Sequence, residues 1–212
     1  GCVYSQSELK EIAEICVKNK IYVISDEIYE KLIYDGLKHF SIAGFGKEIY
    51  DLTVTVNGLS KSHSMTGWRI GYLAASADIT EAVSRFQDHS TSNPNSIAQK
   101  AAVAALTGSS AFFEKIAKDF EERRDYCMER FKKMKHIKPV NPGGAFYIFS
   151  DIGKTGLKSG DFAGRILEEK YVSLIPGEGF GMDTYIRISF ATSMEQLKKG
   201  MDRIEQFLEE IA

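Results

Sequence analysis

The chain has 212 residues, of which 43% are hydrophobic and 26% are charged, and its formal net charge is −2. This length suits one large domain or one and a half ordinary ones, and the composition is that of a soluble globular protein. The balanced charge argues against a nucleic-acid partner, and the three widely spaced cysteines (Cys2, Cys16 and Cys127) form neither a disulfide framework nor a metal knuckle. Because it has no secretory signal and no apolar stretch of membrane length, the sequence indicates a cytoplasmic protein without a membrane partner.

In the first half of the chain, helix and strand patterns follow one another closely. Ser5-x-x-Glu8 has the capping-box spacing, and apolar residues at helical period follow it, which predicts a helix over residues 6–19. Short apolar or β-branched runs predict buried strands at 21–25, 53–56 and 70–75. A helix followed directly by a strand favours an α/β fold with a largely parallel sheet.

The second half of the chain has a different character, and we expect the boundary near residue 107. Helical patterns cover residues 96–106 and a long stretch from about 110 to 134. The patterns beyond it predict strands at 145–149, 171–174 and 185–190, a helix at 160–170, and a final helix capped by Ser193. Residues 1–107 are therefore interpreted as a sheet-bearing domain, and residues 108–212 as a long helix leading into a smaller α+β domain.

The most informative stretch is Asn57-Gly-Leu-Ser-Lys61-Ser-His-Ser-Met-Thr-Gly-Trp-Arg69-Ile-Gly71, which follows a predicted strand. Open α/β folds place ligands at the carboxyl ends of their strands. Small residues on both sides of Lys61 let a flat ligand approach the backbone. Arg69 is placed to return to the same pocket and hold a phosphate through its planar guanidinium group. The alternative is a surface lysine and an arginine in a surface ion pair.

Two further segments suggest a polar site. Asp26 and Tyr29 follow the strand predicted at 21–25; the alternative there is a helix cap and a packed tyrosine. Arg187 lies inside the apolar run Tyr185-Ile-Arg187-Ile-Ser-Phe-Ala191, where an arginine is costly unless an anion neutralises it. An internal salt bridge is the alternative to a bound ligand at this position.

The string Gly58-Leu-Ser-Lys61-x-x-Ser-Met-x-Gly-x-Arg69-Ile-Gly71 resembles the cofactor-lysine signature of class I and II aminotransferases. These enzymes have the fold of type I pyridoxal-phosphate-dependent transferases. The resemblance implies that Lys61 carries pyridoxal 5′-phosphate as a Schiff base and acts as the general base once the substrate amine has freed it.

The same resemblance implies roles for four other residues. Asp26 would face the pyridine nitrogen of the cofactor, Tyr29 its phenolic oxygen, and Arg69 its phosphate. Arg187 would bind the α-carboxylate of the substrate through two hydrogen bonds. The homodimer of such enzymes, with active sites at the interface, is implied as well.

The resemblance covers this whole chain but only the later part of such an enzyme. Residues 1–107 would be the C-terminal part of the large cofactor-binding domain, with a mostly parallel sheet, and residues 108–212 the interdomain helix and the small C-terminal domain. Gly1-Cys-Val-Tyr-Ser5 resembles the tail of the family's Asn-Pro-x-Gly motif, with the Asn lost. We therefore expect the C-terminal portion of a longer protein, inactive on its own. Gly58 departs from the family, because many relatives place a phosphate-binding serine there.

The implied activity is the transfer of an amino group from an amino acid to a 2-oxo acid, with 2-oxoglutarate as the expected acceptor. Aspartate is the expected donor, because the motifs most resemble the bacterial aspartate aminotransferase branch. The nearest alternatives are an aromatic or alanine aminotransferase and a carbon–sulfur lyase of the same fold. An aminotransferase-like domain of a transcription regulator, or a non-catalytic α/β binding module, are alternatives of other classes.

Overall fold

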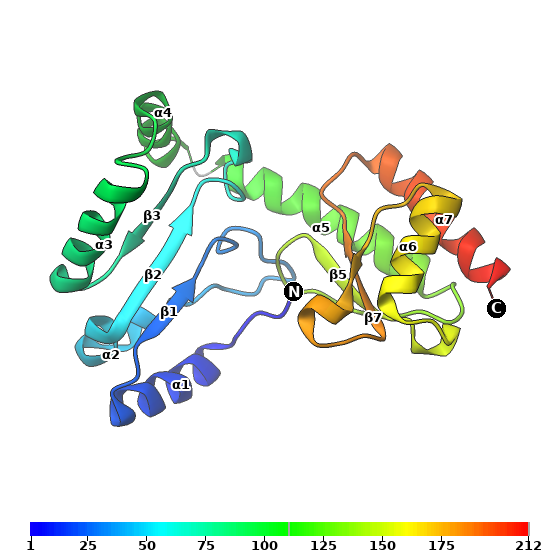
Figure 1. The fold of residues 1–212 in the computed structure, drawn as a ribbon, viewed down its shortest axis with the longest axis horizontal. Helices are drawn as coiled ribbons and strands as arrows, with labels where there is room; N and C mark the ends of the chain where they lie inside the picture. The colour runs from blue at the N-terminus through cyan, green and yellow to red at the C-terminus, as the bar shows by residue number, and fades with distance from the viewer. Residues whose placement is uncertain (110, 212) are drawn as a thin grey trace. The chain divides into compact units, whose positions relative to one another are not determined.

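The computed structural model describes residues 1–109 and 111–211 of a chain that divides into two units (Figure 1). We call Val3–Lys115 the N-terminal unit, and Gly1–Cys2 with Ile116–Ala212 the C-terminal unit. The division falls inside helix α5 (Ala111–Phe131), the long helix that the apolar stripe predicted. Ser110, where that prediction begins, lies outside the described residues.

The N-terminal unit contains a three-stranded sheet in the order β1-β2-β3. Its strands are β1 (Val23–Asp26), β2 (Thr53–Gly58) and β3 (Gly71–Ala74), close to the positions that the sequence predicted. β1 and β2 run parallel, as expected for consecutive strands joined through a helix, whereas β3 is antiparallel to β2. This sheet is therefore mixed.

Helices α1 (Gln6–Asn19) and α2 (Lys47–Leu52) pack against each other in this unit. The predicted capping box opens α1: the Ser5 N–H donates to the Glu8 carboxylate at 2.7 Å, and the Glu8 N–H donates to Ser5 Oγ at 3.3 Å. A small core joins α1, α2 and the short helix η1 (Ile42–Phe45) through Ala13, Cys16, Ile42 and Ile49. Helix η2 (Thr66–Trp68), α3 (Ala77–Ser90) and α4 (Ser96–Leu106) complete the unit.

The C-terminal unit contains a four-stranded antiparallel sheet in the order β4-β5-β7-β6. Its strands are β4 (Lys138–Val140), β5 (Tyr147–Asp151), β6 (Ile175–Pro176) and β7 (Tyr185–Ser189). Its helices beyond α5 are η3 (Gly153–Thr155), α6 (Ser159–Lys170), η4 (Gly177–Phe180) and α7 (Met194–Glu210). The strand predicted at 171–174 is wrong: Tyr171 ends α6 in the left-handed region (φ 56°), and pairing begins only at Ile175.

One face of this second sheet is the apolar core of the C-terminal unit. Ile148 of β5 and Ile186 and Ile188 of β7 point to the buried side, and their neighbours in sequence point to the other side. Phe162 of α6 and Phe207 of α7 are fully buried and meet edge to face, with ring centroids 5.1 Å apart. The same alternation decides which face receives Arg187.

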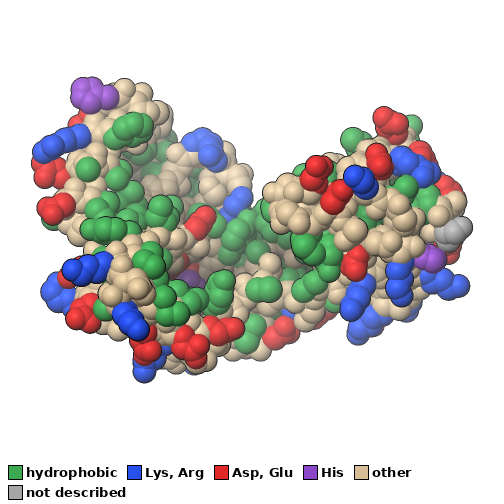
Figure 2. All heavy atoms as spheres, turned by 60° about the horizontal axis from the view of Figure 1, so that its bottom comes forward, with side chains coloured by type: hydrophobic (Ala, Val, Ile, Leu, Met, Phe, Trp, Pro, Cys, Tyr) green, Lys and Arg blue, Asp and Glu red, His purple; other side chains and the backbone are tan. Residues whose placement is uncertain are grey.

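The N-terminal unit leaves large apolar side chains on its surface, where Figure 2 shows hydrophobic groups gathered together. The most exposed of them are Tyr22 (66%), Ile24 (78%), Phe86 (76%) and Ile97 (70%). Contiguous apolar surface of this kind marks interaction sites. Among the described residues, no helix combines the length and apolar character needed to cross a membrane.

Candidate functional site

Three strand ends of the N-terminal unit meet at one edge of its sheet. β1 ends at Asp26, and because β2 runs parallel to it, β2 ends at the same edge (Figure 1). β3 runs in the opposite direction and starts there, with Gly71 paired to Gly58. The predicted site residues on the segments that connect to this edge are Asp26, Tyr29, Lys61 and Arg69.

The Asp26 carboxylate closes the turn that follows β1. Its Oδ1 atom accepts a hydrogen bond from the backbone N–H of Ile28 at 3.2 Å, while the residue as a whole is exposed. Tyr29 lies within the turn and is half-buried, and its carbonyl oxygen accepts the N–H of Leu32 at 2.8 Å. The contact between the Asp26 carboxylate and the Ile28 N–H has the geometry of an Asx turn, and it leaves the acidic group accessible at the edge of the sheet.

Lys61 lies in a tight turn three residues beyond the end of β2. The turn is built around the carbonyl oxygen of Leu59, which accepts the N–H of His63 at 3.1 Å and that of Met65 at 3.2 Å. Leu59 is 1% exposed and so anchors the turn in the interior, whereas Lys61 is half-buried. The backbone around the lysine is therefore fixed by hydrogen bonds and by one buried side chain.

A second set of contacts connects the lysine turn to α4. His63 Nε2 is 3.2 Å from the carbonyl oxygen of Ala105, which only accepts, so Nε2 carries the proton. In the neutral imidazole, Nδ1 then accepts from the hydroxyl of Ser62 at 2.8 Å. Ser62 is 5% exposed and directly follows Lys61. His63 thus has a structural role in this unit, and sequence spacing gave no sign of its partner.

Arg69 precedes β3 and adopts a left-handed conformation (φ 51°). Its Nη1 atom donates to the carbonyl oxygen of Thr66 at 3.0 Å, and the side chain is exposed. The strands beside it pack closely: a Cβ added to Gly58 would lie 3.2 Å from the Gly71 Cα, and one added to Gly71 would lie 3.0 Å from the Asn57 oxygen. A side chain at position 58 would therefore require its neighbours on β3 to shift by a few tenths of an ångström.

Behind Asp26 lies a buried carboxylate that the sequence analysis missed. Glu27 is 7% exposed and accepts hydrogen bonds from the hydroxyls of Ser41 at 2.7 Å and Ser25 at 3.0 Å, and its other oxygen is 2.9 Å from His39 Nε2. Burial by itself would raise the pKa of Glu27, but the hydrogen bonds from His39, Ser41 and Ser25 outweigh it and hold the pKa below its ordinary value. Glu27 thus fixes the segment that carries Asp26.

A neighbouring carboxylate, Glu30, is held by the end of β2. The Asn57 side-chain amide donates to Glu30 Oε1 at 3.1 Å, and Asn57 Oδ1 accepts the N–H of Gly58 at 2.7 Å. Burial, with the negative charges of Glu30 and Glu27, raises the pKa of Tyr72. One oxygen or nitrogen each of Glu27, Glu30 and His39 lie within 4.8 Å of one another. Hydrogen bonds already engage these atoms, so we interpret the group as structural.

Arg187 belongs to the C-terminal unit, on strand β7. It lies on the sheet face opposite the apolar core, paired across the sheet with Phe149. Its guanidinium carbon is 4.3 Å from the centre of the Tyr147 ring and 4.8 Å from that of Phe180. No salt bridge to a described carboxylate engages Arg187, and its buried Nε atom has no hydrogen-bond partner there. The internal salt bridge considered as the alternative is therefore not found in the described part of the chain.

Another buried arginine supports a glycine-rich loop of the C-terminal unit. Arg124 is 2% exposed, and its Nη1 atom donates to the carbonyl oxygen of Pro142 at 2.9 Å. The two glycines that follow donate their N–H groups to the carbonyl oxygen of Gly1, at 2.9 and 3.1 Å. This loop leads into β5, which carries Tyr147.

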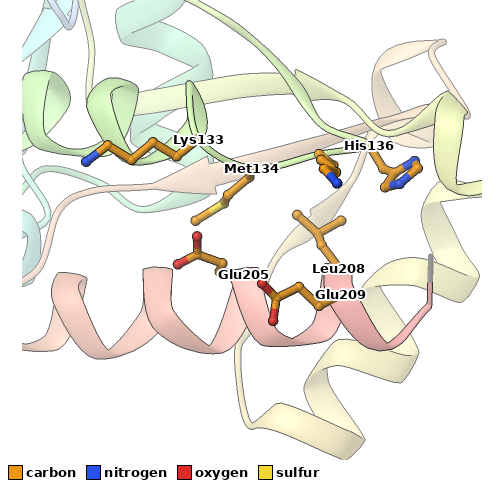
Figure 3. Close-up of a pocket in the computed structure, with 7 residues that line it drawn as sticks. Lys133, Met134, His136, Glu205, Leu208 and Glu209 are labelled. Carbon is orange, nitrogen blue, oxygen red and sulfur yellow. The ribbon is translucent and has the colours of Figure 1, made fainter.

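A pocket of about 250 Å³ lies between α7 and the segment that follows α5. Figure 3 shows Met134 and Leu208 pointing into it from facing segments, with Glu205 and Glu209 along α7. Glu205 is already paired with Arg130 at 2.7 Å. None of the predicted site residues lines this pocket.

Comparison with known proteins agrees with the aminotransferase resemblance of the sequence. The family model for aminotransferase class I and II matches residues 1–204. Aspartate aminotransferases of Bacillus sp. strain YM-2 and Geobacillus stearothermophilus are 44% and 43% identical over 98% and 99% of this chain. The chain spans 54% of the length of each of them.

The fold agrees with a solved structure of similar sequence. The aromatic aminotransferase from Pyrococcus horikoshii OT3 superposes with a TM-score of 0.92 at 39% identity, and the match covers 99% of this chain and 57% of that one. The fold class expected from the sequence, and the family resemblance on which it rested, are confirmed.

Proposed function

The chain belongs to the class I and II aminotransferases, and on that basis we propose that the protein transfers an amino group from an amino acid to a 2-oxo acid. Aspartate is the proposed donor and 2-oxoglutarate the proposed acceptor. The observation that carries the proposal is that Lys61, Asp26 and Arg69 lie on segments that connect to one sheet edge. A lysine, a carboxylate and a guanidinium group at such an edge provide the charges that this chemistry needs.

The groups at this edge fit pyridoxal 5′-phosphate. Lys61 Nζ is the amine that would attach the aldehyde carbon of the cofactor, and the exposed Arg69 guanidinium would hold its phosphate. The accessible Asp26 carboxylate would keep a proton on the pyridine nitrogen, and the Tyr29 hydroxyl would donate to the phenolic oxygen. When bound, the cofactor supplies the electron sink for reaction at the substrate's Cα.

The protein's own residues then bind the substrate and move its proton. Arg187 binds the α-carboxylate, since its guanidinium group forms no salt bridge with a described carboxylate. Lys61 Nζ accepts the proton from the substrate's Cα, for which the amine must be neutral. The turn around Leu59 and the Ser62–His63 contact to α4 hold the lysine backbone while its side chain moves.

Replacing Lys61 tests the proposal in the protein at its natural length. In Lys61→Ala we expect no pyridoxal phosphate to be fixed to peptide 61 by borohydride, and kcat to fall by at least about 100-fold. Lys10→Ala, on the exposed side of α1, is the matched control and should leave both readouts unchanged. If cofactor were trapped on another lysine in the parent protein, the assignment of Lys61 would be wrong.

The donor is tested by comparing kcat/KM for L-aspartate, L-phenylalanine and L-alanine with 2-oxoglutarate as acceptor. We expect the highest value for aspartate. A higher kcat/KM for phenylalanine would identify phenylalanine as the preferred donor, and the proposed amino transfer would still hold. Release of ammonia and pyruvate from a sulfur-containing substrate, without amino transfer, would instead indicate a carbon–sulfur lyase.

We further propose that the protein is a homodimer. The exposed apolar side chains of the N-terminal unit support this, since a partner surface would remove them from water. Light scattering on the protein at its natural length should give twice the mass of one chain. A monomer at micromolar concentration would overturn this part of the proposal.

A further inference from the structure

The guanidinium group of Arg187 lies against two aromatic rings from different parts of the C-terminal unit. Its carbon is 4.3 Å from the centre of the Tyr147 ring, on β5, and 4.8 Å from that of Phe180, at the end of η4. Both distances are within the range of about 6 Å in which a cation is attracted to a ring face. The rings therefore stabilise a half-buried positive charge without using its hydrogen-bond donors.

Strand alternation places these groups on one side of the sheet. Arg187 on β7 pairs directly with Phe149 on β5, and Tyr147 lies two residues before Phe149 on β5. All three side chains therefore share one face of the sheet. Phe149 stacks on Tyr185 with ring centres 4.9 Å apart, and it meets Phe180 edge to face at 5.9 Å. Tyr185, Phe149 and Phe180 thus form a row of rings in contact, and Tyr147 places a further ring against the guanidinium group.

The loop that carries Phe180 is fixed from two directions. A Cβ added to Gly177 would lie 2.3 Å from the Met182 carbonyl oxygen and 2.4 Å from that of Tyr185, so only glycine allows this approach to β7. Fully buried Ser159 accepts the N–H of Glu178 at 3.1 Å and donates to Asp183 at 2.9 Å. Half-exposed Phe180 is therefore held in place by its backbone.

We propose that Tyr147 and Phe180 are positioning residues, a clamp of two rings that holds the Arg187 guanidinium in one orientation for a carboxylate. The inference rests on the proposed function, in which this carboxylate is the α-carboxylate of the substrate. An acidic neighbour would neutralise the arginine and occupy its donors, whereas ring faces leave the positive charge for the ligand. The clamp thus keeps the guanidinium group half-buried, where it attracts a carboxylate strongly, without an acidic side chain that would occupy its donors.

The geometry also determines how the carboxylate is bound. Nε is buried and has no partner among the described residues, so a ligand oxygen does not reach it while the rings stay in place. The carboxylate is therefore bound end-on by the two terminal nitrogens, Nη1 and Nη2. A crystal structure with succinate that placed an oxygen on Nε would overturn this part.

The clamp is tested by succinate binding, measured by calorimetry on the protein at its natural length. Phe180→Leu and Tyr147→Leu should raise the dissociation constant about 3- to 30-fold, the value of a cation–ring contact. Phe180→Tyr and Tyr147→Phe keep a ring and should stay within about twofold of the parent protein. Tyr171→Leu, an exposed position in the same unit, is the matched control and should have no effect.

Kinetics with the better amino-acid donor give a second readout. In the two leucine variants KM should rise by the same factor while kcat stays nearly constant, because the rings act on carboxylate binding. An equal loss for the amine that lacks only the donor's α-carboxylate would overturn the clamp, since that amine lacks the group that Arg187 is proposed to bind. Unchanged binding of succinate in both leucine variants would overturn it as well.

Arg187→Lys separates the clamp from the proposed function. Lysine keeps the positive charge but lacks the paired donors of the planar guanidinium group, so succinate should bind at least about tenfold more weakly. If Arg187→Lys binds succinate like the parent protein, the carboxylate role of Arg187 is wrong and the clamp falls with it. If only Arg187→Lys weakens binding and both leucine variants do not, the carboxylate role stands and the clamp alone is overturned.

Discussion

Glu27 is the residue whose replacement tests most directly how the Asp26 segment is held. Its carboxylate is buried and has three side-chain partners, Ser25, Ser41 and His39, at 3.0, 2.7 and 2.9 Å. Glu27→Ala leaves these three polar groups without their acceptor. Glu27→Gln keeps the shape and one carbonyl oxygen, but it turns an amide N–H₂ group toward one side of the site.

The magnitude follows from the partners. A hydrogen bond to a charged group contributes about 1.5–3 kcal/mol, and less where water replaces the lost partner. Since the two serines and His39 are only half-buried, we expect Glu27→Ala to lower the free energy of unfolding by about 2–4 kcal/mol. For Glu27→Gln, which still accepts from the serine hydroxyls, we expect about 1–2 kcal/mol.

The effect has a definite pH dependence. The folded-state pKa of Glu27 lies below its ordinary value because hydrogen bonds from His39, Ser41 and Ser25 outweigh burial. Its charge therefore contributes stability above the unfolded-state pKa of about 4.3, and the contribution is lost as the pH falls through the folded-state pKa. The difference in stability between the parent protein and Glu27→Gln should thus narrow on acidification below about pH 4.3.

Urea unfolding of the cofactor-free protein, at neutral pH and through the acid range, measures both effects. Glu11→Ala removes an exposed carboxylate of α1 and serves as the control, with an expected change within about 0.5 kcal/mol. If Glu27→Ala costs no more than Glu11→Ala, the hydrogen bonds do not hold this segment. A difference between the parent protein and Glu27→Gln that is constant with pH would refute the role of the charge.

Three further replacements or modifications test the rest of the structure. Gly177→Ala should lower the free energy of unfolding by about 1–3 kcal/mol, because its Cβ would lie 2.3 Å from a carbonyl oxygen. Gly179→Ala is its control in thermal unfolding, since no described atom lies within 4 Å of its Cβ. Ser159→Ala should cost about 1–3 kcal/mol in urea, because it removes a fully buried hydroxyl that accepts the Glu178 N–H and donates to the Asp183 carboxylate. Burial raises the pKa of Cys127 to about 12, so iodoacetamide at about pH 8 should modify exposed Cys2 first. Equal labelling rates in mass spectrometry would contradict this.

Local signals in the sequence predicted most of the elements. The capping box at Ser5 and the cap at Ser193 gave the starts of α1 and α7, and short apolar or β-branched runs gave the strands of the first sheet. Helix α3 was not predicted, although Ile79, Val83 and Phe86 recur along it at helical spacing, and none of its described residues is buried. The strand at 171–174 was wrong because Tyr171 adopts the left-handed conformation of a helix end, which glycine usually provides.

The residues that support the site could not be predicted from the sequence, because their partners are distant along the chain. His39 is 12 positions from Glu27, and His63 is 42 positions from the carbonyl group that it contacts. No periodicity or motif connects such positions, since only the folded chain brings them together. Arg187 was recognisable as a charge in an apolar strand, but Phe180, which contacts it, comes from the short helix η4, whose conformation no local rule specified.

The two arginines on which the proposed chemistry depends differ in how the fold holds them. Arg69 is exposed, and among the described residues its side chain is oriented by a hydrogen bond to the Thr66 carbonyl oxygen of its own turn, so a bound phosphate itself must order the side chain. Arg187 is half-buried and already oriented by two rings, so less side-chain freedom is lost when a carboxylate binds. A tightly held cofactor tolerates the first arrangement because it binds once. A substrate that binds and leaves in every cycle gains more from the second.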